Sequence, residues 1–276
     1  MVQTGAIGAS RAPAAREAVE FPAVREVPIA RALLRRASSR LARYLLRVPR
    51  RLAVDRPMIS FTFDDAPRSA FTTGVPILES AGGRGVFYIA SGLIETAYPC
   101  YELVRPADLR ELRRRGHEIG LHGFRHAPVT ELSAEALRAD IARNRADLEA
   151  IEPGLGSSNF AYPFGQLALG AKATLSGLVG SSRGIVPGVN GDGFDAQNLR
   201  SVELADARLS RAQMADWLNR AARLRGWLIF TLHDVADRPS PYGCTPTFLR
   251  SALEGAVARG FEIVTVGQAL ARTAAK

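Results

Sequence analysis

The chain has 276 residues, 47% of them hydrophobic, so it is long enough for one well-buried barrel and its length does not require two domains. No apolar stretch approaches the roughly 18 residues that a membrane-spanning helix needs. The formal net charge of +9 is unevenly spread. Residues 1–56 hold 12 arginines and 4 acidic residues, whereas the rest of the chain holds 24 basic and 23 acidic residues, so the basic character belongs to the N-terminal segment.

The N-terminal segment, residues 1–56, is predicted to be an extension that precedes the main domain. Residues 1–27 show no consistent hydrophobic period, which predicts a flexible segment. Near residues 29–51, apolar side chains recur at helical spacing with arginines between them, which predicts a basic amphipathic helix. Such a helix can lie on an anionic membrane surface, or it can pack across the open end of the main domain with its arginines in solvent, and the pattern fits both. Nucleic acid is not an expected partner, because no binding motif or aromatic stacking platform accompanies the charge.

Residues 57–276 are predicted to form a single α/β domain. Short apolar runs alternate with helical stretches, which is typical of repeated βα units around a mainly parallel sheet. The expected strands are 58–63, 86–90, 118–121, 159–162, 178–180, 199–204, 227–232 and 262–264. The expected helices are 70–80, 106–114, 133–151, 168–176, 210–224 and 246–258.

Two adjacent carboxylates, Asp64 and Asp65, end the first expected strand, and strand ends are where α/β barrels present catalytic groups. Three of the four histidines follow other strand ends: His122 and His126 follow the third, and His233 follows the seventh. One carboxylate with two imidazoles is a sufficient ligand set for a divalent metal that keeps one position open. A second carboxylate and a third imidazole then remain for proton transfer. Each residue alone has an ordinary structural explanation, but their joint occurrence favours a catalytic metal site.

Four motifs follow one another along the chain. The first, Thr62–Pro67, reads Thr-Phe-Asp-Asp-Ala-Pro, and the second is Gly116–Gly120 followed by the His122 and His126 pair in His-x-x-x-His spacing. The third is Phe160–Gly165, with an aromatic residue ahead of Tyr-Pro-Phe-Gly, and the last is the Leu-His pair that ends in His233. Together they resemble the polysaccharide deacetylases of the NodB-homology family, carbohydrate esterase family 4, over roughly residues 57–270.

The resemblance implies an incomplete (β/α)7-type barrel that hydrolyses an N-acetyl amide on a sugar of a glycan or glycan precursor and releases acetate. It implies three ligands, Asp65, His122 and His126, for a divalent metal that we expect to be zinc. It also implies that Asp64 is the general base and His233 the general acid. The backbone N–H of Phe164 would help to bind the oxyanion.

Two positions depart from the family pattern. Ala66 replaces the usual glycine, from which we expect that this backbone position does not need a positive φ. The third motif lacks the arginine that pairs with the catalytic base in many members, so Asp64 needs another cationic partner. Arg183, which follows an apolar run, is a candidate for that partner, with an ordinary surface arginine as the alternative. The carboxylate that would orient the acid histidine is open among Asp192, Asp195 and Asp234.

Two loops, residues 188–194 and 239–243, are candidates for the substrate groove, because glycine, aromatic and polar residues gather there, and ordinary surface turns are the alternative. His117 is expected to be structural, because it precedes a strand instead of following one. Cys100 and Cys244 lie far apart in sequence and are expected to be free thiols, with a disulfide as the alternative.

No secretory signal is visible in the sequence, so the expected location is the cytoplasm, with attachment to the inner membrane face as an extension of that expectation. Two other functions stay open. One is hydrolysis of another linear or cyclic amide on the same fold, and the other is glycan binding by a non-catalytic barrel. The complete set of carboxylates and histidines argues against the non-catalytic alternative.

Overall fold

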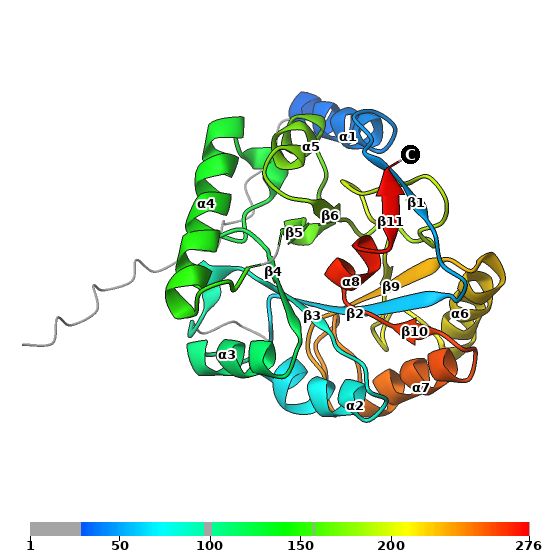
Figure 1. The fold of residues 1–276 in the computed structure, drawn as a ribbon. Coiled ribbons are helices and arrows are strands. Elements are labelled where there is room, and N and C mark those ends of the chain that lie inside the picture. The colour runs from blue at the N-terminus through cyan, green and yellow to red at the C-terminus, as the bar shows by residue number, and fades with distance from the viewer. Residues whose placement is uncertain (1–28, 97–100, 157, 276) are drawn as a thin grey trace, which may run out of the picture.

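The structure is a computed structural model that describes residues 29–96, 101–156 and 158–275. Its centre is a curled, mainly parallel sheet whose strands follow the order β6-β5-β4-β3-β2-β9-β8, and Figure 1 shows helices around the outside. This is the predicted incomplete (β/α)7-type barrel. The strands are β2 (Met58–Asp64), β3 (Val86–Ile89), β4 (Glu118–Leu121), β5 (Asn159–Ala161), β6 (Ser181–Arg183), β8 (Val202–Glu203) and β9 (Trp227–Leu232), and β10 (Glu262–Ile263) pairs with the start of β2.

Strand β2 shows why Asp64 points into the barrel. Every residue of β2 is buried, as expected for a parallel strand that is covered on both faces. Phe61 and Phe63 pack in the cluster that the outer helices share, whereas the hydroxyls of Ser60 and Thr62 bond to the carbonyls of Val264 and Phe230. Because side chains alternate with a period of two, Asp64 points to the same side as Ser60 and Thr62.

The outer helices begin at recognisable caps. The hydroxyl of Ser133 accepts the Ala136 N–H before α4, and Ser210 forms a capping box with Gln213 before α6. The helices are α3 (Pro106–Arg114), α4 (Ala134–Ile151), α5 (Leu169–Ser176), α6 (Arg211–Leu224) and α7 (Pro246–Val257), each within a residue of its expected bounds.

The helix expected over residues 70–80 is divided. A π-helical turn, η1 (Ala70–Gly74), precedes α2 (Val75–Glu79). Pro76 stands in the first turn of α2, where its missing N–H costs nothing, and it cannot continue the hydrogen-bond ladder of the turn before it.

Several expected bounds are wrong. The strand expected at residues 178–180 lies at β6, three residues later, and the strand expected at residues 199–204 is reduced to β8. The sequence also gave no sign of a second, three-stranded antiparallel sheet made of β11 (Thr273–Ala275), β1 (Pro49–Leu52) and β7 (Phe194–Asp195). These strands are two to four residues long, and only their tertiary pairing makes them strands.

The helix expected near residues 29–51 is α1 (Ile29–Ala42), so its predicted end is wrong. Leu46 takes a positive φ of 50°, and Pro49 begins β1, so the chain cannot continue as a helix there. Instead of crossing the open end of the barrel, α1 lies beside α5 on the flank (Figure 1), where Ser38 Oγ accepts the Leu169 N–H. The flexible segment expected over residues 1–27 lies outside the described residues.

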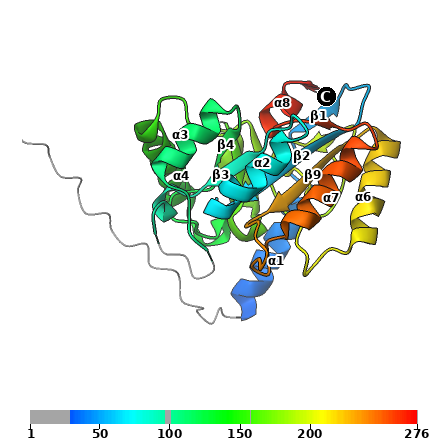
Figure 2. The same cartoon turned by 90° about the horizontal axis from the view of Figure 1, so that it is seen from below.

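The two ends of the barrel differ. We call the end where the parallel strands begin the closed end, because a cluster that includes Met58, Trp227 and Val266 fills it. Figure 2 shows β1 and α8 (Val266–Leu270) together at this end. We call the opposite end, where the strands finish, the mouth. No helix of the described residues is both long and apolar enough to cross a bilayer.

Candidate active site

An ion pair between Asp64 and Arg183 lies inside the barrel at the mouth. Asp64 ends β2 and Arg183 ends β6, and the curl of the sheet brings the two side chains together. Nη2 of Arg183 lies 2.6 Å from Oδ1 of Asp64 and also contacts Oδ2. Arg183 is fully buried, with its guanidinium 5.3 Å from the ring centre of Tyr88. The surface-arginine alternative is therefore wrong, and each buried charge has its counter-charge.

A potential metal group lies directly beside this pair. Oδ1 of Asp65 is 3.0 Å from Nε2 of His126 and 3.4 Å from Nε2 of His122, and all three residues are buried. His122 Nδ1 lies 2.8 Å from the carbonyl of Ala161, which can only accept a hydrogen bond, so this nitrogen carries the proton. In a neutral His122, Nε2 then turns a lone pair toward Asp65 Oδ1, a buried oxygen without a hydrogen bond. Two acceptors facing each other need a cation between them, so these residues fit a divalent metal.

The pKa values of Asp65 and His122 also favour a positive charge at this group. Burial opposes ionisation of Asp65, but the positive charge that the adjacent His126 and His122 can carry outweighs burial and holds the Asp65 pKa well below its ordinary value. Burial likewise disfavours a charged His122, yet the adjacent carboxylates of Asp65 and Asp64 raise the His122 pKa above its usual range. The site therefore stabilises positive charge, which a proton or a metal can supply.

Helix α4 holds the histidine loop in place. Asn144 Oδ1 accepts the His122 N–H, and its amide donates to the Ile89 carbonyl. Asp140 accepts the N–H groups of Phe124 at 2.8 Å and Arg125 at 3.1 Å. The sequence reading missed both residues. Their signal was two polar side chains, four residues apart, on the otherwise apolar buried stripe of α4.

Four residues of the site have left-handed backbones. Their φ values are 59° at Asp65, 51° at Ala66, 51° at His126 and 57° at Phe164. The expectation that Ala66 does not need a positive φ is therefore wrong. The turn after β2 is fixed by tertiary contacts, among them the bond from Val104 N–H to the Ala66 carbonyl, so an L-residue is held where glycine would be relaxed.

His233 lies on the far side of the carboxylate pair. It follows β9, and its Nε2 is 4.0 Å from Oδ2 of Asp65. Its Nδ1 is buried and has no hydrogen-bond partner among the described residues. None of the three candidate carboxylates orients His233, because Asp192 pairs with Arg51, Asp195 with Lys172, and Asp234 with Ser240.

Aromatic rings flank the site. The ring of Phe164 is half-exposed, and its centre lies 4.5 Å from the ring centre of His126. The ring centre of Tyr242 lies 5.5 Å from that of His233. The Tyr101 hydroxyl donates to Asp65 Oδ2 at 3.2 Å. The loop at residues 239–243 therefore reaches the mouth as expected.

The loop at residues 188–194 does not reach the mouth. Asn190 exchanges backbone hydrogen bonds with Trp227, the first residue of β9, at the closed end. Its predicted role in the substrate groove is wrong, because the chain crosses to the closed end to form β7.

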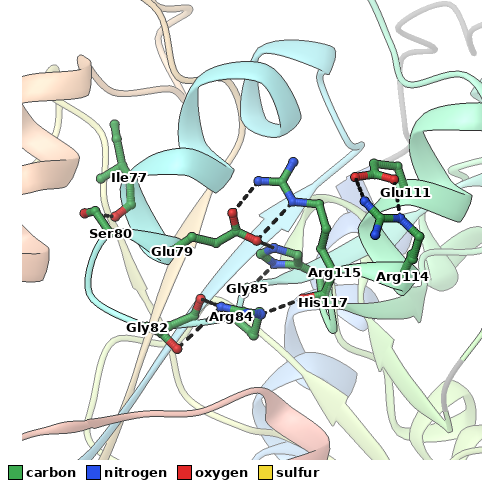
Figure 3. A network of polar contacts seen from close by, with 11 residues as sticks. Ile77, Glu79, Ser80, Gly82, Arg84, Gly85, Glu111, Arg114, Arg115 and His117 are labelled. Carbon is green, nitrogen blue, oxygen red and sulfur yellow. Dashed lines mark hydrogen bonds and ion pairs between the residues drawn. The ribbon is translucent and has the colours of Figure 1, made fainter.

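The fourth histidine is also remote from the mouth. His117 Nδ1 accepts the Gly85 N–H at 2.9 Å, and its Nε2 lies 3.3 Å from Oε1 of Glu79 (Figure 3). Arg115 forms a two-pronged ion pair with the same Glu79. His117 joins α2 to the chain before β4, in keeping with a structural role. Cys244 is a buried thiol whose pKa burial raises, and Cys100 lies outside the described residues.

Comparison with known proteins gives the same class as the fold and the motifs. The sequence model of the polysaccharide deacetylase family matches residues 51–176, and no protein of curated function matches the chain. The Xyl-CE4 domain of a multidomain xylanase from the hindgut metagenome of Trinervitermes trinervoides shares the fold, with a TM-score of 0.56 and 19% identity over 79% of this chain and 91% of that one.

Two further structures share the fold. A family 4 acetyl xylan esterase from Clostridium thermocellum, in complex with a cobalt ion, has a TM-score of 0.55 and 22% identity, covering 78% of this chain and 90% of its own. The chitin deacetylase of Colletotrichum lindemuthianum has a TM-score of 0.55 and 17% identity, covering 79% and 89%. Fold and site thus define a hydrolase built on a deacetylase barrel. Over residues 51–176, which hold the first three motifs, the chain matches the polysaccharide deacetylase family, as those motifs predicted.

Proposed function

We propose that the protein hydrolyses the N-acetyl amide of a sugar in a glycan or glycan precursor and releases acetate, with a bound divalent metal. The observation that carries the proposal is the buried group of Asp65, His122 and His126 beside an Asp64 that is paired with Arg183. The match of residues 51–176 to the sequence model of the polysaccharide deacetylase family supports the same reaction class.

Three atoms would hold the metal: Oδ1 of Asp65 and the Nε2 atoms of His122 and His126. Zinc is the proposed ion, because mixed imidazole and carboxylate ligands suit it, and a fold relative is described with cobalt, which accepts similar ligands. When bound, the metal would polarise the amide carbonyl and lower the pKa of a water molecule.

The chain's own side chains would move the protons. Asp64 would accept the proton of the attacking water, and Arg183 would supply the positive charge that pairs with the Asp64 carboxylate. His233 Nε2 faces the carboxylates and would donate a proton to the departing amine nitrogen. The backbone N–H of Phe164 would bind the oxyanion, a contribution of about 10²–10³ in rate for such a donor.

Two kinds of bond are candidates for cleavage, an acetyl ester and an N-acetyl amide. One fold relative is an acetyl xylan esterase and another is a chitin deacetylase. We propose the amide, and the ester is an outcome of the test. Hydrolysis of another linear or cyclic amide is the remaining enzymatic alternative. A non-catalytic barrel is disfavoured, since the carboxylates and histidines are brought together at one mouth.

The test compares acetate release from N-acetylglucosamine oligomers and from acetylated xylan, with wild-type protein and Asp64→Asn at equal zinc content. We expect release from the oligomers that is abolished in Asp64→Asn. Release from xylan alone would replace the amide by the ester, and no Asp64-dependent release from either would refute the proposal.

We also propose a cytoplasmic location at the inner membrane face. Fractionation of cells, with an antibody to the chain, tests it.

A further inference from the structure

We propose that the exposed side of α1 and the turn after it form a binding surface for an anionic lipid bilayer. We call this surface the α1 face. Its members alternate between large apolar and arginine side chains, all exposed: Leu34, Arg36, Arg40, Leu41, Arg43, Tyr44, Leu45 and Leu46.

Exposed apolar side chains concentrate on this surface. Of the ten large apolar residues that are most exposed in the described chain, five lie between residues 34 and 46. The exposed fractions are 71% for Leu34, 78% for Tyr44 and 51% for Leu46. Single exposed apolar residues are ordinary, but five in 13 positions form a patch of the kind that marks a binding surface.

Helical geometry separates the α1 face from the side of α1 that packs. Ser38 and Ala42, four residues apart, turn toward α5: Ser38 Oγ accepts the Leu169 N–H, and Ala42 is fully buried. Leu34 and Leu41 lie together along one border of this packed side, since each is three or four residues from Ser38, and both are exposed. Arg36 and Arg40 lie on the side of α1 away from Ser38, so the exposed surface of the helix has an apolar border and a basic side.

The turn after α1 is held so that its apolar side chains remain outside. The ammonium group of Lys172, fully buried, donates to the carbonyls of Ala42 at 2.7 Å and Leu45 at 2.8 Å and pairs with Asp195. Arg47 Nη2 donates to the Gly193 carbonyl at 2.5 Å. With the backbone fastened at both sides, the side chains of Tyr44, Leu45 and Leu46 cannot fold back to cover themselves. A pre-ordered apolar turn loses little entropy when it enters a bilayer.

Charge identifies the partner. Within the described ranges, no carboxylate lies within 4.0 Å of the guanidinium groups of Arg36, Arg40 or Arg43. Residues 1–28 hold three arginines and three glutamates, so they offer no surplus negative charge to this surface. Guanidinium groups bind phosphate oxygens through paired donors, and leucine side chains between them need an apolar medium. An anionic bilayer supplies both, whereas nucleic acid supplies no partner for the leucines.

The α1 face also has a fixed relation to the mouth. Arg35 pairs with Glu131, which ends η3 (Val129–Glu131) a few residues after His126. The other end of α1 reaches the Asp195 network near the closed end, so α1 runs along the flank (Figure 2). A bilayer on this flank would lie alongside the barrel and leave the mouth uncovered. Lipid binding would therefore be compatible with catalysis but does not depend on it.

The test is sedimentation of the full chain with vesicles of phosphatidylcholine alone or with about one third phosphatidylglycerol, at low and physiological salt. We expect binding to the anionic vesicles that salt weakens. The variant Arg36→Gln/Arg40→Gln/Arg43→Gln should lower the partition coefficient at least tenfold, and Leu41→Ser/Leu46→Ser should lower it severalfold at both salt concentrations.

Matched controls alter equally exposed residues elsewhere. Arg138→Gln/Arg223→Gln/Arg250→Gln removes the same charge, and Leu224→Ser/Val257→Ser removes similar apolar surface, and both should bind as the wild type does. Circular dichroism and melting temperature establish that every variant is folded. Three results would each overturn the proposal. They are equal binding by the arginine variant of the α1 face and its arginine control, equal binding of the wild type to both vesicle types, and loss of binding when residues 2–28 alone are deleted. So would a change of molar mass in solution between wild type and the leucine variant, because the α1 face would then bind a second copy of the chain.

Discussion

The guanidinium of Arg183 and the carboxylate of Asp64 meet inside the barrel, with Nη2 2.6 Å from Oδ1, although 119 positions separate the residues in sequence. The third motif of the chain holds no arginine, yet Asp64, the proposed general base, has an arginine beside it from β6. The same cationic support is thus provided from a different strand.

Replacing Arg183 should impair the chemical step. In Arg183→Met the Asp64 carboxylate loses its buried cationic partner, so we expect kcat to fall about 10–100-fold. Measurement of kcat and KM at saturating zinc checks this. Arg200→Met, which removes an exposed arginine, is the control. An unchanged kcat in Arg183→Met would remove Arg183 from the mechanism.

Asp140 should act through the position of the metal ligands. Asp140→Asn replaces an oxygen acceptor by an amide in front of the Phe124 and Arg125 N–H groups, so the loop that carries His126 loosens. We expect the metal dissociation constant to rise about 10–100-fold, as for other outer partners of ligands, with a smaller change of kcat at saturating zinc. Titration calorimetry with zinc checks this, and the exposed Asp216→Asn is the control. A purely structural role would lower the melting temperature and leave the dissociation constant unchanged.

Ala66 should be a point of backbone strain. Its φ of 51° costs an L-residue roughly 1–2 kcal/mol, a cost that glycine avoids. Glycine also makes the unfolded chain more flexible, which lowers the stability of the folded state by about 0.4–1 kcal/mol. Ala66→Gly should therefore stabilise the protein slightly, by about 0.5–1 kcal/mol, without loss of activity. Ala142→Gly, in the exposed middle of α4, should destabilise it by about 0.5–1 kcal/mol. Urea unfolding of the two variants decides the matter, and destabilisation by both would show that Ala66 is not strained.

The Glu79 network should make stability depend on pH. The Arg115 hydrogen bonds lower the pKa of Glu79 from 4.5 to about 2, so the folded state favours the ionised form. A lowered folded pKa contributes stability that is fully present above the unfolded value and is lost as pH falls from about 4.5 toward 2. Glu79→Gln should therefore destabilise the protein at pH 7 by about 1–2 kcal/mol after allowance for solvent screening, and by less at pH 3.5. A destabilisation that does not shrink as pH falls would contradict this.

The sequence predicted elements whose pattern is local. Strands β2 and β9 are buried on both faces and are rich in aromatic and branched apolar residues, and α4, α6 and α7 begin at capping hydroxyl residues. The strands β1, β7 and β11 could not be predicted, because Arg50 pairs with Ala275 and Phe194 only once the barrel has closed. The loop at residues 188–194 was placed at the wrong end for the same reason.

The residues of the site also fall into those that local sequence predicted and those that depend on tertiary contacts. The strand ends indicated Asp64, Asp65 and the three histidines, because parallel strands bring their carboxyl ends to one edge. The contact of Arg183 with Asp64 depends on the curvature of the sheet, so the sequence could offer Arg183 only as a candidate. The left-handed backbone of Ala66 is held by tertiary contacts, the Val104 N–H to its carbonyl and the bridge from Pro67 to Leu103, which no local pattern reveals.

The measurement that tests the central claim most directly is acetate release from N-acetylglucosamine oligomers before metal removal, after chelation and after zinc is returned, in wild type and Asp64→Asn. The account predicts that wild-type activity disappears with the metal and returns with one zinc per chain, while Asp64→Asn binds zinc and stays inactive. Acetate release that persists without metal, or that is equal in Asp64→Asn, would contradict metal-dependent deacetylation at this site.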